Sequence, residues 1–193
     1  FTVTTGNPNY ESKEGVLFSK LEGNKLKLIQ YPLGKEEETK GKYKLPENTK
    51  EIEKYGLYGN EKLQYITFNE GLSTIRENAF GKMTDIRTIT LPSTIQTIEG
   101  NAFKGCSKLR IVVMKEEVNV QCPEETVFEQ TDSKLRIFVK DTNTITTICN
   151  KNVIKYSKQE TISDYIHYVV TSTEEKTLVI YGMENMTETF TEG

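Results

Sequence analysis

Few residues in this chain of 193 could do catalytic or metal-binding chemistry. It has one His and three Cys, which are Cys106, Cys122 and Cys149. The cysteines are separated by 16 and 27 residues and form no CxxC pair, and only His167 could join them. A structural zinc site needs four ligands at close spacing, and a lone His removes most Ser-His and Cys-His nucleophile pairs. We therefore expect neither a metal site nor catalytic residues.

The motifs around these residues lead to the same expectation. His167 lies in DYIHYVV (164–170), which alternates as a β-strand does, so we interpret it as a surface or half-buried strand residue. No Ser or Cys lies in a GxSxG context, and no glycine-rich phosphate loop is present. The acidic pairs lack the alternating spacing of a calcium loop and are read as solvated charge. We expect no enzyme activity and no cofactor.

Charge and hydropathy exclude two further classes of partner. The chain has 25 Lys and Arg against 28 Asp and Glu, a formal net charge of −3, without a basic block. Nucleic-acid binding needs clustered Lys and Arg, so it is not expected. The longest apolar runs, such as 111–114, have the length of a strand and fall far short of the roughly 20 residues of a membrane helix. We expect no membrane insertion of this segment.

An internal sequence repeat predicts the secondary-structure elements of this chain. Segments 63–85 and 86–108 align without a gap at a period of 23 residues. Seven pairs are identical: Ile66/Ile89, Thr67/Thr90, Thr74/Thr97, Ile75/Ile98, Asn78/Asn101, Ala79/Ala102 and Phe80/Phe103. Cys106 takes the position of Met83, which predicts a small buried side chain. That leaves Cys122 and Cys149 as a pair that is either bridged or reduced.

Each repeat has two halves with different physical character. The first, of form LxxIxL, is rich in β-formers and predicts a strand followed by a turn. The second contains Asn78 before Ala79 and Phe80, and Asn as an N-cap predicts a single helical or 3₁₀ turn. Stacked units would join their strands in a parallel sheet, with Phe80 and Phe103 on the opposite side of one continuous core. The predicted class is an α/β repeat, mostly β, forming a solenoid.

These residues carry a family resemblance. IRTITLPSTIQTIEGNAFKGCSKL (86–109) resembles the BspA-like leucine-rich repeat, whose pattern runs roughly LxxIxLPxxxxxIxxxAFxxCxxL. NPNYESKEGVLFSKLEGNKLKLIQYP (7–32) resembles the hairpin insert of such proteins, and TLVIYGMENMTE (177–188) resembles the opening strand of another repeat block. We expect the chain to be cut from a longer array.

The domain organisation follows from these segments. We expect a solenoid over 1–140, including the hairpin insert 7–32. We expect a capping or connecting segment over 141–163. We expect the β-rich start of a further module over 164–193. The hairpin is also indicated by its residues, because two apolar β runs flank Glu22-Gly23-Asn24.

The resemblance implies a cell-surface or secreted protein that binds a protein or cell-surface ligand, as adhesins bind host matrix proteins or other cells. A second hypothesis belongs to another class: a structural spacer that projects another domain and binds nothing itself. Fold alone does not choose between them.

The strand pattern predicts where a partner would bind. Because side chains alternate along a strand, those on either side of Ile66 point outward, and the 23-residue period places their equivalents in two columns. The predicted protein-binding residues are Lys42, Lys44, Tyr65, Thr67, Thr88, Thr90, Ile111 and Val113. The alternative is that these residue types simply suit an exposed strand. Glu99, in the other half of its repeat, is also expected on the surface.

Overall fold

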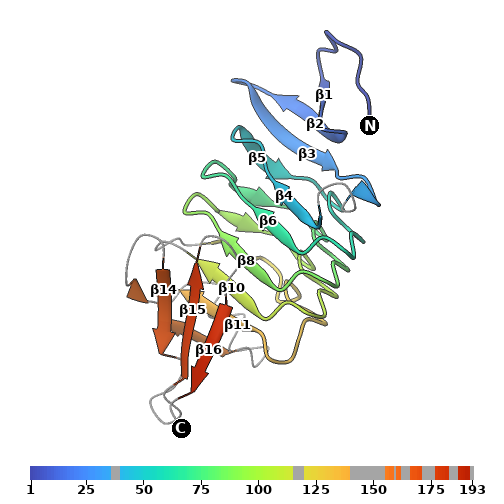
Figure 1. The fold of residues 1–193 in the computed structure, drawn as a ribbon. Helices are drawn as coiled ribbons and strands as arrows, with labels where there is room; N and C mark the ends of the chain where they lie inside the picture. Colours follow the sequence, from blue (N-terminus) through green and yellow to red (C-terminus); the bar gives the residue numbers. More distant parts are fainter. Residues whose placement is uncertain are drawn as a thin grey trace.

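The chain forms a stack of short β-strand turns between an N-terminal hairpin and a C-terminal sheet (Figure 1). The computed structural model describes residues 1–35, 40–114 and 120–139, followed by the strands 155–158, 160–161, 166–170, 177–182 and 187–191. Among these residues the regular structure is almost entirely β, as the repeat predicts. No helix in the described part of the chain is long and apolar enough to cross a membrane.

The N-terminal hairpin forms as predicted and is built into the solenoid. Strands β1 (Tyr10–Lys13), β2 (Val16–Leu21) and β3 (Lys25–Gln30) pair antiparallel in that order. The β1–β2 turn has both Glu14 (φ 49°) and Gly15 (φ 77°) in the left-handed region, which matches the twist of the flanking strands. The free edge of β3 pairs in parallel with β5 (Thr49–Ile52), so the hairpin continues the first turn of the solenoid.

One side of the solenoid, here called the front sheet, collects the LxxIxL strands. They are β4 (Lys42–Lys44), β6 (Tyr65–Thr67), β8 (Thr88–Leu91), β10 (Ile111–Met114), β11 (Arg136–Val139) and β12 (Lys155–Lys158). Hydrogen bonds join β4 to β6 and, as a second group, β8 to β10, β11 and β12; β6 and β8 are neighbours without a ladder between them. All the pairings are parallel, and Val112 lies opposite Ile89 as the repeat predicts. Ile111 lies opposite Arg136, two residues beyond the 23-residue period, so a two-residue insertion is accommodated before β11.

A second side, here called the back sheet, is formed by the other half of each repeat. Strands β5, β7 (Thr74–Ile75) and β9 (Thr97–Ile98) pair in parallel, with Ile52, Ile75 and Ile98 in register. The repeats of β4, β6 and β8 therefore each contribute two short strands, where the sequence predicted one. Two-residue strands carry too little alternation to stand out in a sequence pattern.

The prediction of a helical turn after Asn78 is wrong. Asn78 (φ 55°) and Lys82 (φ 58°) are left-handed, which interrupts any helix. The amides instead alternate between two acceptors. Those of Ala79, Gly81 and Met83 donate to the carbonyl three residues back, whereas those of Asn78, Phe80 and Lys82 donate to the next repeat. Backbone bonds between repeats thus continue along this third side, where a helix would have kept them within one repeat.

The core is a column of repeated side chains. Phe103 stacks between Phe80 (ring centroids 5.1 Å, interplanar angle 10°) and Phe128 (5.5 Å, 8°). Cys106 is fully buried in the Met83 position, as predicted. Gly56 takes the position that Ala79 holds in the next repeat; there a Cβ would lie 3.0 Å from both the Glu53 carbonyl oxygen and Leu28 Cδ2.

The last described strands form a separate antiparallel sheet. It contains β13 (Glu160–Thr161), β14 (Ile166–Val170), β15 (Thr177–Gly182) and β16 (Thr187–Thr191) in that order. His167 lies in β14, opposite Tyr181 of β15, so its predicted place in a strand is confirmed. Cys149 lies outside the described residues, so the structure does not test whether it is bridged to Cys122.

Candidate protein-binding surface

The structure places the predicted residues on the outward side of the front sheet in two paired groups, one on β4 and β6 and one on β8 and β10. The parallel register places Lys42 beside Tyr65 and Lys44 beside Thr67, and it places Thr88 beside Ile111 and Thr90 beside Val113. Their neighbours Tyr43, Ile66, Ile89 and Val112 are buried in the core. The "outer face" below means Lys42, Lys44, Tyr65, Thr67, Thr88 and Thr90.

The outer face is open to solvent over β4, β6 and β8. Lys42, Lys44 and Thr67 are exposed, and Tyr65, Thr88 and Thr90 are half-buried. Lys42 Nζ lies 5.8 Å from the centre of the Tyr65 ring, a cation–π contact that links two neighbouring strands. This surface combines basic, aromatic and hydroxyl groups without a role in the core.

The expectation of exposure is wrong for Val113. Its side chain is 1 % exposed and forms a second small apolar cluster with Phe138, against which the half-buried Ile111 packs. Strand β14 of the C-terminal sheet approaches β12, the last strand of the same front sheet. The outward side of β10 and β11 is therefore covered, and a partner can reach the columns only up to β8.

A column of ion pairs on the back sheet was not predicted. Arg76 Nη2 lies 2.9 Å from Glu51 Oε2, and Arg76 Nη1 lies 3.1 Å from Glu99 Oε1. Lys27 Nζ extends the column by contacting Glu53 Oε2 at 2.7 Å. Glu99 Oε2 also accepts a hydrogen bond from the Glu77 amide at 3.0 Å. Glu99, which we expected on the surface, is half-buried and bonded to two neighbours. The signal in the sequence was the 23-residue spacing of Glu53, Arg76 and Glu99, with alternating charge.

This column shifts the titration of Glu53. Partial burial alone would raise the pKa of Glu53, but hydrogen bonds from Lys27 and the Lys54 amide, together with the charge of Arg76, outweigh burial and lower it. The carboxylate is therefore held in its charged form. Through its ion pair with Lys27 of β3, the Glu53 carboxylate joins the hairpin to the back sheet.

An aromatic pair lies where the back sheet meets the turn side. Tyr55 and Tyr58 meet edge to face with centroids 5.3 Å apart, and Lys54 Nζ lies 5.3 Å from the Tyr55 ring centre. Tyr55 is left-handed (φ 62°) in the position that Asn78 and Asn101 hold in the following repeats. Tyr55 is 44 % exposed and lies outside the outer face, so it can serve as a control for Tyr65.

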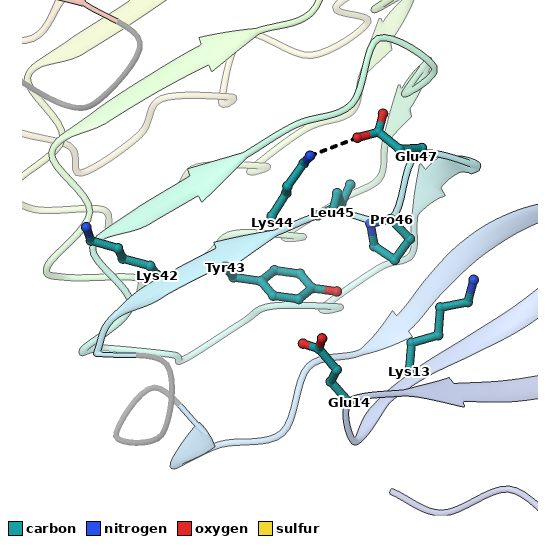
Figure 2. A pocket seen from close by; sticks show the side chains of 8 residues that line it. All are labelled: Lys13, Glu14, Lys42, Tyr43, Lys44, Leu45, Pro46 and Glu47. Atoms are coloured by element: carbon teal, nitrogen blue, oxygen red, sulfur yellow. Dashed lines mark ion pairs between the residues drawn. The ribbon is translucent and has the colours of Figure 1, made fainter.

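Two hollows lie beside the front sheet. One, of about 350 Å³, lies between the Lys13–Glu14 turn of the hairpin and β4 with residues 45–47 (Figure 2). The other, of about 230 Å³, is lined by Arg87, Lys108 and Arg110. In the second hollow, Arg110 is paired with Asp132 at 2.8 Å, and Lys108 with Asp85.

Cys106 has a structural environment, and no metal cluster is found among the residues that the structure describes. In the described part of the chain, no group of three His, Cys, Asp or Glu is placed to hold a metal ion. Burial raises the pKa of the Cys106 thiol to about 12, and its Sγ donates to the Phe80 carbonyl at 3.1 Å. A buried neutral thiol of this kind is a structural group and a poor nucleophile.

Three solved structures are similar to this chain in fold. A leucine-rich repeat protein from Eubacterium ventriosum has a TM-score of 0.59 at 23 % identity, over 73 % of this chain and 36 % of its own. A leucine rich cell surface protein from Faecalibacterium prausnitzii gives 0.51 at 19 %, over 78 % and 40 %. The pneumococcal vaccine antigen PcpA gives 0.52 at 19 %, over 80 % and 49 %. This chain thus covers between about a third and a half of each of those proteins.

The family comparison covers most of the chain. No curated protein gives a significant match. Residues 38–171 match the model of the BspA type leucine rich repeat region in six copies. The match includes all the front-sheet strands from β4 to β12. The parallel register, the column of stacked phenylalanines and this match lead to one conclusion: the chain belongs to the BspA-type leucine-rich repeat family.

Proposed function

We propose that this chain is a non-enzymatic binding module of a cell-surface or secreted protein and that it holds a protein or cell-surface partner on its outer face. The observation that carries the proposal is the exposed double column over β4, β6 and β8. Lys42, Tyr65 and Thr67 occupy it without contributing to the core. Stacked repeats offer such extended surfaces for binding, and aromatic residues are prominent among interface hot spots.

The surface location is part of the proposal. One structure of the same fold is described as a cell surface protein and another as a vaccine antigen, which supports a surface location here. A host matrix protein or another cell is then the partner we propose.

Solid-phase binding tests the proposal directly. The full chain is applied to intact host cells and to immobilised matrix proteins, beside an unrelated protein of similar size and charge. We expect saturable binding to at least one surface, above the level of the control. Binding no greater than the control on every surface would contradict the proposal and favour the spacer hypothesis.

A further inference from the structure

The hollow beneath the hairpin contains a polar group without a partner. Tyr43 lies at the inner end of this hollow, its side chain is 8 % exposed, and its hydroxyl oxygen is buried with no hydrogen-bond partner. Figure 2 shows this hydroxyl pointing into the space between Pro46 and the Lys13–Glu14 turn. The ring of Tyr31, packed edge to face at 4.8 Å, fixes the ring of Tyr43 in place. Burial of an unpaired hydroxyl costs free energy that a bound group can recover.

The hydroxyl is held in its neutral form. Burial raises the pKa of Tyr43, and the nearby Tyr31 and Glu14 raise it further. A neutral phenol both donates and accepts hydrogen bonds. Tyr43 is therefore available as an acceptor at any physiological pH.

The charges around the hollow leave one group open. Lys13 is paired with Glu11 at 3.2 Å, and Lys44 with Glu47 at 3.0 Å. Lys42 contacts the Tyr65 ring on the outer face. Glu14 lies on the wall that faces Tyr43, and its carboxylate makes no ion pair or hydrogen bond with the described residues (Figure 2). The open groups are thus a carboxylate and a phenol oxygen, which are both acceptors.

We propose that this hollow binds the side chain of a lysine or arginine presented by a protein partner, with the Glu14 carboxylate as counter-ion and the Tyr43 hydroxyl as hydrogen-bond acceptor. A volume of about 350 Å³ is at the lower end for ligand sites and suits one side chain better than an extended ligand. The aliphatic stem would lie along Leu45, Pro46 and the Tyr43 ring. Lys13, the last residue of β1, and Glu14, in the turn that follows, have exposed side chains, and the proposal requires them to rotate so that the bound cation reaches the buried hydroxyl.

Peptide titrations followed by amide chemical shifts test this site. The probes are acetyl-Ala-Ala-Xaa-Ala-Ala-amide peptides with Xaa as Lys, Arg, norleucine or Glu, added to the isotope-labelled full chain. We expect the Lys and Arg peptides to shift the amides of Glu14, Gly15 and Tyr43 saturably, and we expect the other two peptides not to. Glu14→Gln should weaken the Lys peptide about tenfold, because a charged hydrogen bond is lost, and added salt should weaken it as well.

Two substitutions separate recognition from folding. Tyr43→Phe removes only the hydroxyl and should weaken Lys-peptide binding several-fold without lowering the melting temperature. Glu22→Gln, at the exposed turn between β2 and β3, is the matched control and should leave the affinity unchanged. Equal or tighter binding of the Glu or norleucine peptide would overturn the proposal, as would an unaltered affinity in both pocket variants or no shift with any peptide. Lys42 and Lys44 line both this hollow and the outer face. The proposed contacts come from Glu14 and Tyr43, which do not belong to the outer face, so failure of this site would leave the proposed function standing.

Discussion

The phenyl rings of Phe80 and Phe103 lie almost parallel, 5.1 Å apart and one repeat apart in the sequence. Phe128 continues the stack on the other side of Phe103. A side chain placed between two copies of itself contributes its burial to two interfaces at once. In a solenoid, whose stability comes from neighbouring units, such a position is a point of local weakness when it is emptied.

Phe103→Ala should therefore be strongly destabilising. Removing a fully buried ring typically costs about 3–5 kcal/mol, and here the cavity faces both adjacent repeats. Urea unfolding measures the loss, with Phe68→Ala as the control because Phe68 is only partly buried and should cost less. Hydrogen exchange should show amides between 80 and 130 opening before those of the hairpin. Uniform loss of protection along the chain would contradict this assignment.

Lys82→Gly should leave the protein equally stable or stabilise it by up to about 1 kcal/mol. Lys82 is left-handed (φ 58°), and the equivalent residues of the adjacent repeats are Gly59 (φ 73°) and Gly105 (φ 75°). Glycine adopts this conformation without steric cost, whereas in a helix interior it would cost about 1 kcal/mol. Thermal unfolding of the two proteins distinguishes the cases, and a clear loss of stability would restore the helical interpretation of this segment.

Glu99→Ala should cost about 1 kcal/mol, more than a solvated surface charge. The substitution breaks the ion pair with Arg76 and removes the acceptor of the Glu77 amide. Glu22→Ala, at the exposed turn between β2 and β3, is the comparison in the same urea titration. A difference of less than about 0.3 kcal/mol between the two variants would show that the back-sheet ion column contributes nothing.

Glu53 should make stability depend on acid pH. Its pKa is lower in the folded protein than in the unfolded chain, so the unfolded state binds the proton first as the pH falls. The contribution is complete above the ordinary pKa of Glu, about 4.3, and is lost as the pH falls through the folded-state value. Urea unfolding between pH 3 and pH 7 should show a shallower pH dependence for Glu53→Gln than for the wild type. Parallel pH profiles would refute the assignment.

The sequence predicted the register of the solenoid because the core itself repeats. Ile89 and Val112 face each other at the 23-residue spacing, and their burial makes a register shift costly. The prediction failed where one residue type serves two conformations. Asn78 suits both a helix N-cap and a left-handed turn, and the composition of the segment does not distinguish them.

The candidate site was predicted in part for a related reason. Side chains alternate along β6, so Tyr65 and Thr67 must point away from the core when Ile66 points into it. It gives no information on what packs over the outward side, so the cover over Val113 and Phe138 was missed. The Tyr43 pocket was missed because it forms between the hairpin and β4. The repeat pattern gives no information on how the hairpin packs beside β4.

Binding by two matched variants tests the central claim, that the outer face holds the partner. The first double variant, Tyr65→Ala with Thr67→Glu, alters the outer face. The second, Tyr55→Ala with Gln96→Glu, is the control and lies elsewhere on the solenoid. Each variant removes a tyrosine that lies beneath a lysine, and each adds one negative charge at an exposed position. Ile111 is left unchanged because it packs against the second apolar cluster. On the cell or matrix surface that captures the wild type, the outer-face variant should lose at least tenfold in affinity while the control variant binds as the wild type does. Equal binding by both variants, each with an unchanged melting temperature, would contradict the claim.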